Sequence, residues 1–235
     1  MQRIWMGSEM IRREALGRRL LFYFGGLFIM TFGVVLSVKS DLGVTPISSI
    51  PYTMTVVAGM DLGLATIVFS VAVVILQILI LRRDYRPIDL LQIPVGIVFG
   101  AFLTLCGDLM APIPNPDSFP VQFLLMLAST VFVALGVFLY VPANFIPLAP
   151  EGFILAVSKA TKKEFSVVKI VSDVSMVIIS LAVCLIMIGA LGSVGIGTVV
   201  AALLVGTEVK WMVKHLQRVR GWVAVENSSD DPNAR

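Results

Sequence analysis

The stretch KSDLGVTPISSIPYTMTVVAGMDLG, Lys39 to Gly63, constrains how the whole 235-residue chain can be arranged. It carries two prolines, Pro46 and Pro51, and several hydroxyl side chains, so it is too polar and too interrupted for an ordinary membrane span. Long apolar segments bracket it on both sides. A second such stretch, VPANFIPLAPEGFILAVSKATKKEF from Val141 to Phe165, takes the equivalent place in the other half of the chain.

The composition identifies an integral membrane protein. Hydrophobic residues make up 57% of the sequence and charged residues 14%, and the mean hydropathy is +0.95. Soluble domains use roughly 45–50% apolar and about 25% charged residues. Six apolar segments are each long enough for a helix to cross a bilayer core of about 30 Å. They cover residues 21–38, 62–81, 88–110, 121–141, 166–188 and 194–209.

A proline-rich linker separates two membrane halves. The linker, residues 111–120, contains neither Lys nor Arg and lies between a first membrane repeat, 21–110, and a second, 121–210. The leader, residues 1–20, is too long and too charged for the first region of a signal peptide, so we expect it to be retained in the cytoplasm. Residues 211–235 combine a basic segment, expected on the cytoplasmic surface, with a polar tail expected to be disordered.

Several classes of function are poorly supported by the residues. The only histidine, His215, lies in the basic segment, so neither haem ligation, a histidine metal site nor a Ser-His-Asp hydrolase is expected within the membrane. The chain has no Walker A sequence and no basic patch with interleaved aromatic residues, which argues against an ATP-driven motor and against nucleic-acid binding. We therefore expect no catalytic residue, no metal and no cofactor.

The two halves of the sequence resemble each other at a constant spacing. The run GVVL at 33–36 matches GVFL at 136–139, and residues 61–70 align without gaps on residues 164–173. Both matches have an offset of 103 residues. A constant offset across separate segments predicts an internal repeat.

The proline-bearing stretches are expected to dip into the membrane and return. The buried part of the first stretch, residues 46–59, has about 14 residues, which as helix span roughly 21 Å against a core of about 30 Å. Re-entry also places every basic cluster on the side of the N-terminus, as the positive-inside rule requires. The alternative, in which segments 44–59 and 146–159 cross, would place the arginines of 82–86 opposite the N-terminus and make the repeats parallel.

Re-entry fixes the predicted architecture. Each half then crosses the membrane three times, so the second half is inverted relative to the first. The predicted fold is an all-α polytopic membrane protein, with six transmembrane helices arranged as two inverted three-helix repeats. Each repeat carries a short re-entrant or broken helical segment, and both termini are cytoplasmic.

Three motifs resemble a known family. KSDLGVTPISSIPY after the first span, RPID at the start of the third span, and especially GIGTVVAALLVGTEVKW near the end are similar to the YczE/YitT-like family of bacterial multi-pass membrane proteins. The similarity extends over residues 19–211. The resemblance implies a bacterial plasma-membrane protein of poorly defined activity. The chain departs from the family pattern at Ile47 and Thr207, which would alter what the first re-entrant stretch binds. The resemblance is carried by Leu42, Gly43, Pro46, Gly197, Thr198 and Leu204 to Gly206.

Hydroxyl and amide side chains near the prolines are candidates for binding a solute. Such groups at helix ends inside a membrane cavity can bind an anionic or zwitterionic molecule. The alternative is structural, because the same groups can satisfy backbone atoms that prolines free, and an acid after Pro150 can cap a helix. The candidate substrate-binding residues are Thr45, Ser48, Ser49, Tyr52, Gln92 and Glu151.

Charged side chains within the spans are the second group of candidates. Inserting such a group costs several kcal/mol, so each needs a partner, a wet cavity or a function. Lys169 and Asp173 lie four residues apart in the fifth span and therefore share one helix face. They are predicted either to form a structural ion pair or, together with Glu151, to couple transport to protons or another ion.

The expected function is a secondary transporter or facilitator of a small polar solute, with a site near the membrane midplane between the repeats. A membrane scaffold or regulatory protein without transport is the main alternative, and a channel or a substrate-binding subunit also stays open. An enzyme is not expected. Basic residues beside the spans are expected to contact anionic lipid headgroups, and a homo-oligomer is compatible with the sequence.

Overall fold

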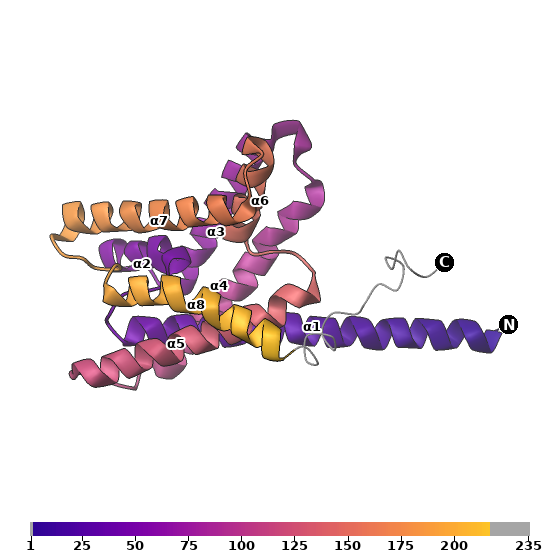
Figure 1. The fold of residues 1–235 in the computed structure, drawn as a ribbon, viewed down its shortest axis with the longest axis horizontal. Helices are drawn as coiled ribbons and strands as arrows, with labels where there is room; N and C mark the ends of the chain where they lie inside the picture. Colours follow the sequence, from indigo (N-terminus) through magenta and orange to yellow (C-terminus); the bar gives the residue numbers. More distant parts are fainter. Residues whose placement is uncertain (1, 217–235) are drawn as a thin grey trace.

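The proline-bearing stretches fold as short helices set between long ones. In the computed structural model, which describes residues 2–216 and the side chains from Leu16 onward, helices of the two kinds follow in the same order in both halves (Figure 1). The long helices are α1 (Gln2–Lys39), α3 (Leu62–Leu81), α4 (Gln92–Met110), α5 (Phe119–Tyr140), α7 (Phe165–Ile188) and α8 (Ile196–His215). The short helices are α2 (Pro46–Ala58) and α6 (Ala149–Thr161), and the 3-10 turns are η1 (Arg82–Asp84), η2 (Pro87–Leu91) and η3 (Val141–Ala143).

The six long helices confirm an all-helical, multi-pass membrane protein. Each is apolar enough over 18 residues to cross a bilayer, and residues 2–216 contain no strand. The predicted leader is continuous with α1, and α8 runs on through the start of the basic segment to His215. The predicted disordered tail, residues 225–235, lies outside the described residues, and so does the end of the basic segment from residue 217 onward.

Proline and left-handed residues set the ends of the two short helices. α2 begins at Pro46 and α6 has Pro150 in its first turn, where the missing N–H of proline costs no helical hydrogen bond. Both helices end at a left-handed residue, Gly59 with φ 66° and Lys162 with φ 56°. Each has 13 residues, so each is about 20 Å long and too short to cross a core of about 30 Å.

Residues that lie 103 positions apart share backbone conformations. Thr45 and Leu148, which precede the two short helices, have φ/ψ angles of −59°/149° and −59°/151°. Asp41 and Asn144 are both left-handed, with φ angles of 56° and 50°. The same offset relates the two halves of the sequence, so the resemblance extends from residue types to local structure.

Close packing of α1 against α5 forms the centre of the bundle. A Cβ atom at Gly26 would lie 2.7 Å from the backbone nitrogen of Tyr140, and one at Gly136 would lie 2.5 Å from Cβ of Met30. Glycine therefore lets the two helices approach more closely than any larger residue would. The main buried apolar cluster surrounds this contact.

Each short helix packs against a long helix of the opposite half. α2 packs on α7, and α6 packs on α3. The two halves therefore interlock, and any displacement of one short helix relative to its own half also changes its contacts with the other half.

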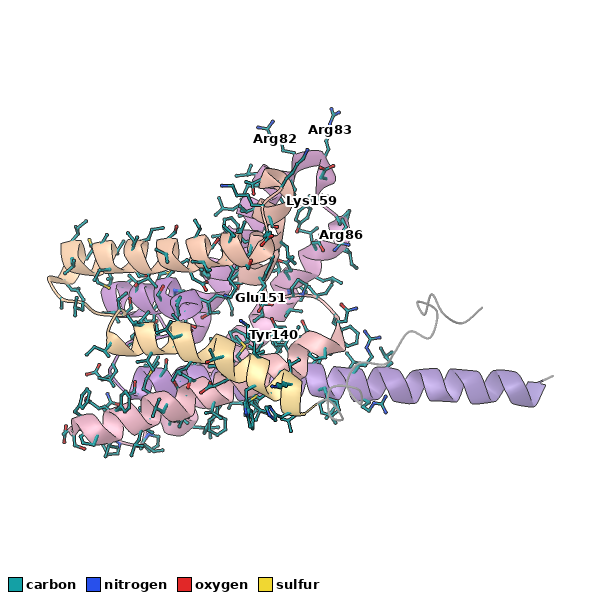
Figure 2. All side chains as sticks on the ribbon, viewed as in Figure 1. Arg82, Arg83, Arg86, Tyr140, Glu151 and Lys159 are labelled. Carbon is teal, nitrogen blue, oxygen red and sulfur yellow. The ribbon has the colours of Figure 1, made fainter. Side chains whose placement is uncertain are left out.

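Basic residues gather at one end of the bundle, which we call the basic end. It is defined by Arg19, Arg82, Arg83, Arg86 and Lys159. Figure 2 shows Arg82 and Arg83 at the tip of the connection between α3 and α4, with Arg86 and Lys159 nearer the helices. Arg19 donates to the backbone of η3, and the first residues of α1 and the last of α8 lie at this same end (Figure 1).

The opposite end, which we call the linker end, carries Lys39 and the linker. The Lys39 ammonium donates to the backbone oxygen of Ile113 at 2.6 Å. The backbone N–H of Val44, just before α2, donates to the oxygen of Ser193 in the α7–α8 turn at 3.2 Å. The chain thus approaches α2 from the linker end, whereas it approaches α6 from η3 at the basic end.

Candidate functional site

The first turns of α2 and α6 line one small cavity in the middle of the protein. The cavity has a volume of about 30 Å³, which is room for roughly two water molecules. Ser48 contributes the polar surface from α2, and Leu148 and Pro150 face it from the start of α6. Thr66 and Ser70 of α3 add two further hydroxyl groups. In this conformation the cavity is too small for an organic solute.

The hydroxyl groups of α2 divide into two sets. Thr45 donates to Ser48 at 3.1 Å, next to the cavity. Ser49 instead points to α7: it donates to the oxygen of Pro46 at 2.7 Å and accepts from Ser180 at 3.1 Å. Ser49 is completely buried and holds α2 against α7 through this contact, whereas its role in binding stays a prediction.

Tyr52 stands apart from the other candidates. It is half-buried, lies outside the lining of the central cavity, and makes no hydrogen bond with any residue in the described part of the chain. Its neighbour Thr53 is buried and bonds to the Ser193 hydroxyl at 2.6 Å. The Cys184 sulfur lies 3.8 Å from the Thr53 hydroxyl and 3.7 Å from the Ser193 hydroxyl. These three side chains therefore pack α2 against the α7–α8 turn.

Glu151 lies at the start of α6 against the end of α5. Its carboxylate accepts a hydrogen bond from the Tyr140 hydroxyl and interacts with the backbone N–H of Leu148, the residue before the helix. Lys169 of α7 is close enough to act on it electrostatically. Figure 2 shows Glu151 and Tyr140 together in the interior, below the basic end. Both predicted roles of Glu151, helix capping and a charged site, therefore have support in its contacts.

Lys169 and Asp173 form the ion pair expected from their spacing. The Lys169 ammonium lies 2.9 Å from Oδ2 of Asp173. The second oxygen, Oδ1, is buried and makes no hydrogen bond with the described residues. Such an oxygen is costly to bury and is a natural place for a proton or a bound cation.

The offset of 103 residues relates the hydroxyl groups at the cavity to the charged cluster. Ser48, Thr66 and Ser70 line the cavity, and the positions 103 residues later are occupied by Glu151, Lys169 and Asp173. The same three places therefore carry hydroxyl groups in one half and ionisable groups in the other. Ser48 and the three ionisable residues are candidates from the sequence, whereas Thr66 and Ser70 are brought to this site by the structure alone.

Gln92 belongs to a different site, at the basic end. The Gln77 amide donates to Oε1 of Gln92 at 2.8 Å and to the oxygen of Ala149 at 3.0 Å. Both glutamines form part of the wall of a cavity of about 240 Å³ between α3, the α3–α4 connection and α6. At its rim Arg86 is hydrogen-bonded to Asp89, which raises the pKa of the Arg86 guanidinium above its usual value.

Sequence reasoning missed several polar residues inside the spans. Tyr140 and Gln77 hold candidate residues in place, as described above. Glu208 of α8 accepts from the buried Thr130 hydroxyl at 3.0 Å, and its other oxygen is buried without a hydrogen bond to the described residues. A carboxylate within a predicted span is itself a signal of function, and Glu208 met that criterion as clearly as Asp173 did.

Among the side chains that the structure describes, those of residues 16–216, no group of three His, Cys, Asp or Glu is placed to hold a metal ion.

Comparison with known proteins places the chain in a family. No curated protein and no solved structure matches it. The family model described as "Family of unknown function (DUF6198)" matches residues 17–214, from the start of the first span to the end of the last. The chain therefore belongs to this family of unknown function, DUF6198.

Proposed function

We propose that the protein is a secondary transporter or facilitator of a small polar solute in the bacterial plasma membrane. The observation that carries the proposal is that two short, non-spanning helices present their first turns to one central cavity. Interrupted helices that meet near the membrane midplane are the arrangement in which many secondary transporters bind their solutes. The resemblance to the YczE/YitT-like family agrees with this membrane.

The two halves are proposed to be inverted repeats with re-entrant α2 and α6. Their matching backbone angles at an offset of 103 residues support the repeat. Each short helix is too short to cross, and the chain enters the two helices from opposite ends of the bundle, which supports re-entry and inversion. Both termini are then cytoplasmic, and the basic end faces the cytoplasm.

The starts of the short helices favour a solute with an anionic group. Neither Thr45 nor Leu148, the residues that precede α2 and α6, caps its helix with a side chain. The positive ends of the two helix dipoles therefore face the cavity from two sides. In a conformation in which this cavity is wider, it would attract a carboxylate or a phosphate.

The two ends of the protein differ in openness, as alternating access requires. At the basic end, Gln77, Gln92 and Gly152 surround the cavity of about 240 Å³. The positions 103 residues away are Ser180, Gly195 and Ser49, at the linker end. There Ser180 bonds to Ser49, and Gly195 packs on the backbone oxygen of residue 42 so tightly that a Cβ atom would lie 2.3 Å from it. In the proposed transport cycle, this conformation is the one that is open at the basic end and closed at the linker end.

Glu151, Lys169 and Asp173 are the proposed coupling site. Their charges can be rearranged by one proton, because Lys169 is paired with Asp173 and also acts electrostatically on Glu151, and one oxygen of Asp173 has no hydrogen-bond partner within the described chain. A proton gradient would then supply the driving force.

Transport in liposomes tests the proposal. We expect purified protein to move a solute, or protons with it, and Glu151→Gln and Asp173→Asn to lower that flux about tenfold or more, since a hydrogen bond to a charged group contributes roughly 1.5–3 kcal/mol. Asp117→Asn is the matched control, because Asp117 is an exposed carboxylate of the linker. Absence of flux for every solute in a broad library, with both variants keeping the wild-type phenotype in cells, would remove the transport function.

A further inference from the structure

A polar cavity opens at the basic end between the α3–α4 connection and α6. Its volume is about 240 Å³, and since one water needs roughly 10–15 Å³ by the same measure, a molecule of amino-acid size fits inside. Figure 2 shows Arg86 and Lys159 near each other at this end, outside the pair formed by Glu151 and Tyr140. The polar and charged side chains of the cavity are Gln77, Asp84, Arg86, Asp89, Gln92 and Lys159.

The charges of this cavity leave one free anion and one free cation. Arg86 and Asp89 neutralise each other, with Nη2 of Arg86 at 2.9 Å from Oδ1 of Asp89. Asp84 and Lys159 are exposed, and their side chains have no hydrogen bond or ion pair with any described side chain from residue 16 to residue 216. Asp84 lies in η1 on one wall and Lys159 in the last turn of α6 on another. The cavity therefore offers separate sites for a positive and a negative group.

Two buried amides form the inner wall and add a free donor. Gln77 and Gln92 are each only 2% exposed. The amide nitrogen of Gln77 donates hydrogen bonds to Gln92 and to the backbone of α6. The amide nitrogen of Gln92 makes no hydrogen bond in the described part of the chain. Gly152 leaves room for this amide, because a Cβ atom there would lie 2.4 Å from Nε2 of Gln92. A donor without a partner at the wall of a cavity favours a ligand that accepts a hydrogen bond.

We propose that this cavity binds a small zwitterionic solute that carries both a carboxylate and an ammonium group. Lys159 and the Gln92 amide bind the carboxylate, and Asp84 binds the ammonium. An anion alone would meet Asp84 with a like charge, and a cation alone would meet Lys159 in the same way. The proposal rests on the transport function and deepens it, since it names the class of solute that enters from the basic end.

Binding of charge-matched probes tests the proposal. The full-length protein in lipid nanodiscs is titrated calorimetrically with L-serine, L-serinamide and N-acetyl-L-serine at about pH 6, where α-amino groups are protonated. These probes share a side chain but are a zwitterion, a cation and an anion. Glycine and L-glutamine serve as a smaller and a larger zwitterion. We expect at least one zwitterion to bind and the two singly charged probes to bind at least about tenfold more weakly.

Substitutions in the cavity locate the site. Lys159→Gln and Asp84→Asn should each weaken zwitterion binding about tenfold, and Lys159→Arg should retain it. Gly152→Ala should also weaken binding, because its methyl group displaces the Gln92 amide. Lys163→Gln is the control, since this exposed lysine does not line the cavity. Unchanged thermal unfolding of the Lys159 and Asp84 variants shows that they fold.

The results separate this proposal from the transport function. If no zwitterion binds, if L-serinamide or N-acetyl-L-serine binds as tightly as L-serine, or if Lys159→Gln and Asp84→Asn bind like the wild type, the cavity is not a zwitterion site. If another solute is transported in that case, the transport function is still supported. If zwitterion binding depends on Lys159 and Asp84 but no flux occurs in liposomes, the binding site is supported and the transport function is ruled out.

Discussion

Ser48 and Glu151 occupy the same place in the two halves of the protein. Each is the third residue of its short helix, and the two are 103 residues apart. Ser48 accepts a hydrogen bond from Thr45 at the central cavity, whereas Glu151 accepts one from Tyr140 at the end of α5. The first half thus presents a hydroxyl group where the second presents a carboxylate, so the two short helices differ in charge although they are alike in backbone.

The Tyr140 hydroxyl is expected to stabilise the protein through Glu151. Tyr140→Phe removes the donor and leaves the Glu151 carboxylate partly unsatisfied, so we expect the free energy of unfolding to fall by about 1–3 kcal/mol. Thermal unfolding in detergent measures the change. Tyr85→Phe is the control, because the Tyr85 hydroxyl is buried without a hydrogen bond to the described residues and its removal should cost nothing. Equal losses in the two variants would contradict the proposed contact.

Neighbouring glycines of α1 should differ sharply in their tolerance of a methyl group. Gly26→Ala would place Cβ 2.7 Å from the nitrogen of Tyr140 and 2.9 Å from the oxygen of Gly136, both backbone atoms, so α1 and α5 must separate. We expect a loss of about 1–3 kcal/mol in unfolding free energy, as for other overpacked sites. Gly25→Ala meets no atom within 4 Å and should be neutral or slightly stabilising. A Gly26→Ala protein as stable as Gly25→Ala would contradict the close approach of these helices.

Labelling of the left-handed residues that end α2 and α6 tests the inverted topology. Gly59 and Lys162 lie 103 residues apart at the ends of the two short helices. With both native cysteines, Cys106 and Cys184, replaced by alanine, an impermeant thiol reagent added outside intact cells should label Gly59→Cys and not Lys162→Cys. Labelling of both or of neither from outside would show that the halves are parallel, and labelling of Lys162→Cys alone would reverse the proposed orientation.

The helices could be predicted because their signals are local. The six spans follow from runs of apolar residues, and the two short helices from prolines at their starts combined with an apolar length below that of a bilayer core. The Lys169–Asp173 pair was predicted for the same reason, since a spacing of four residues determines proximity within one helix.

The partners of the candidate residues could not be predicted, because they come from helices distant in sequence. Ser49 is bonded to Ser180, 131 residues away, and the buried place of Ser49 follows from how α2 packs on α7. Gln92 was proposed as a binding residue together with the hydroxyl groups of the first stretch, and the structure places it with Gln77 at the basic end. Contacts between helices cannot be read from any single segment of sequence. Ser49 and Gln92 were therefore grouped as candidates by residue type alone.

Contact between Thr53 and Ser193 offers a way to lock the linker end. Their hydroxyl oxygens lie 2.6 Å apart, so Thr53→Cys combined with Ser193→Cys should place two sulfur atoms within reach of a disulfide of about 2.05 Å. Cys184 must be replaced by serine in this protein, because it lies within 3.8 Å of both positions and would compete for the bond. If alternating access requires this end to open, oxidation should abolish flux in liposomes and reduction should restore it, whereas Thr53→Cys alone should respond to neither. Mass spectrometry of the cross-linked peptides measures the extent of the bond. Complete cross-linking with undiminished flux would mean that the solute passes without separation of α2 from the α7–α8 turn, and the linker end would then not be the closed gate.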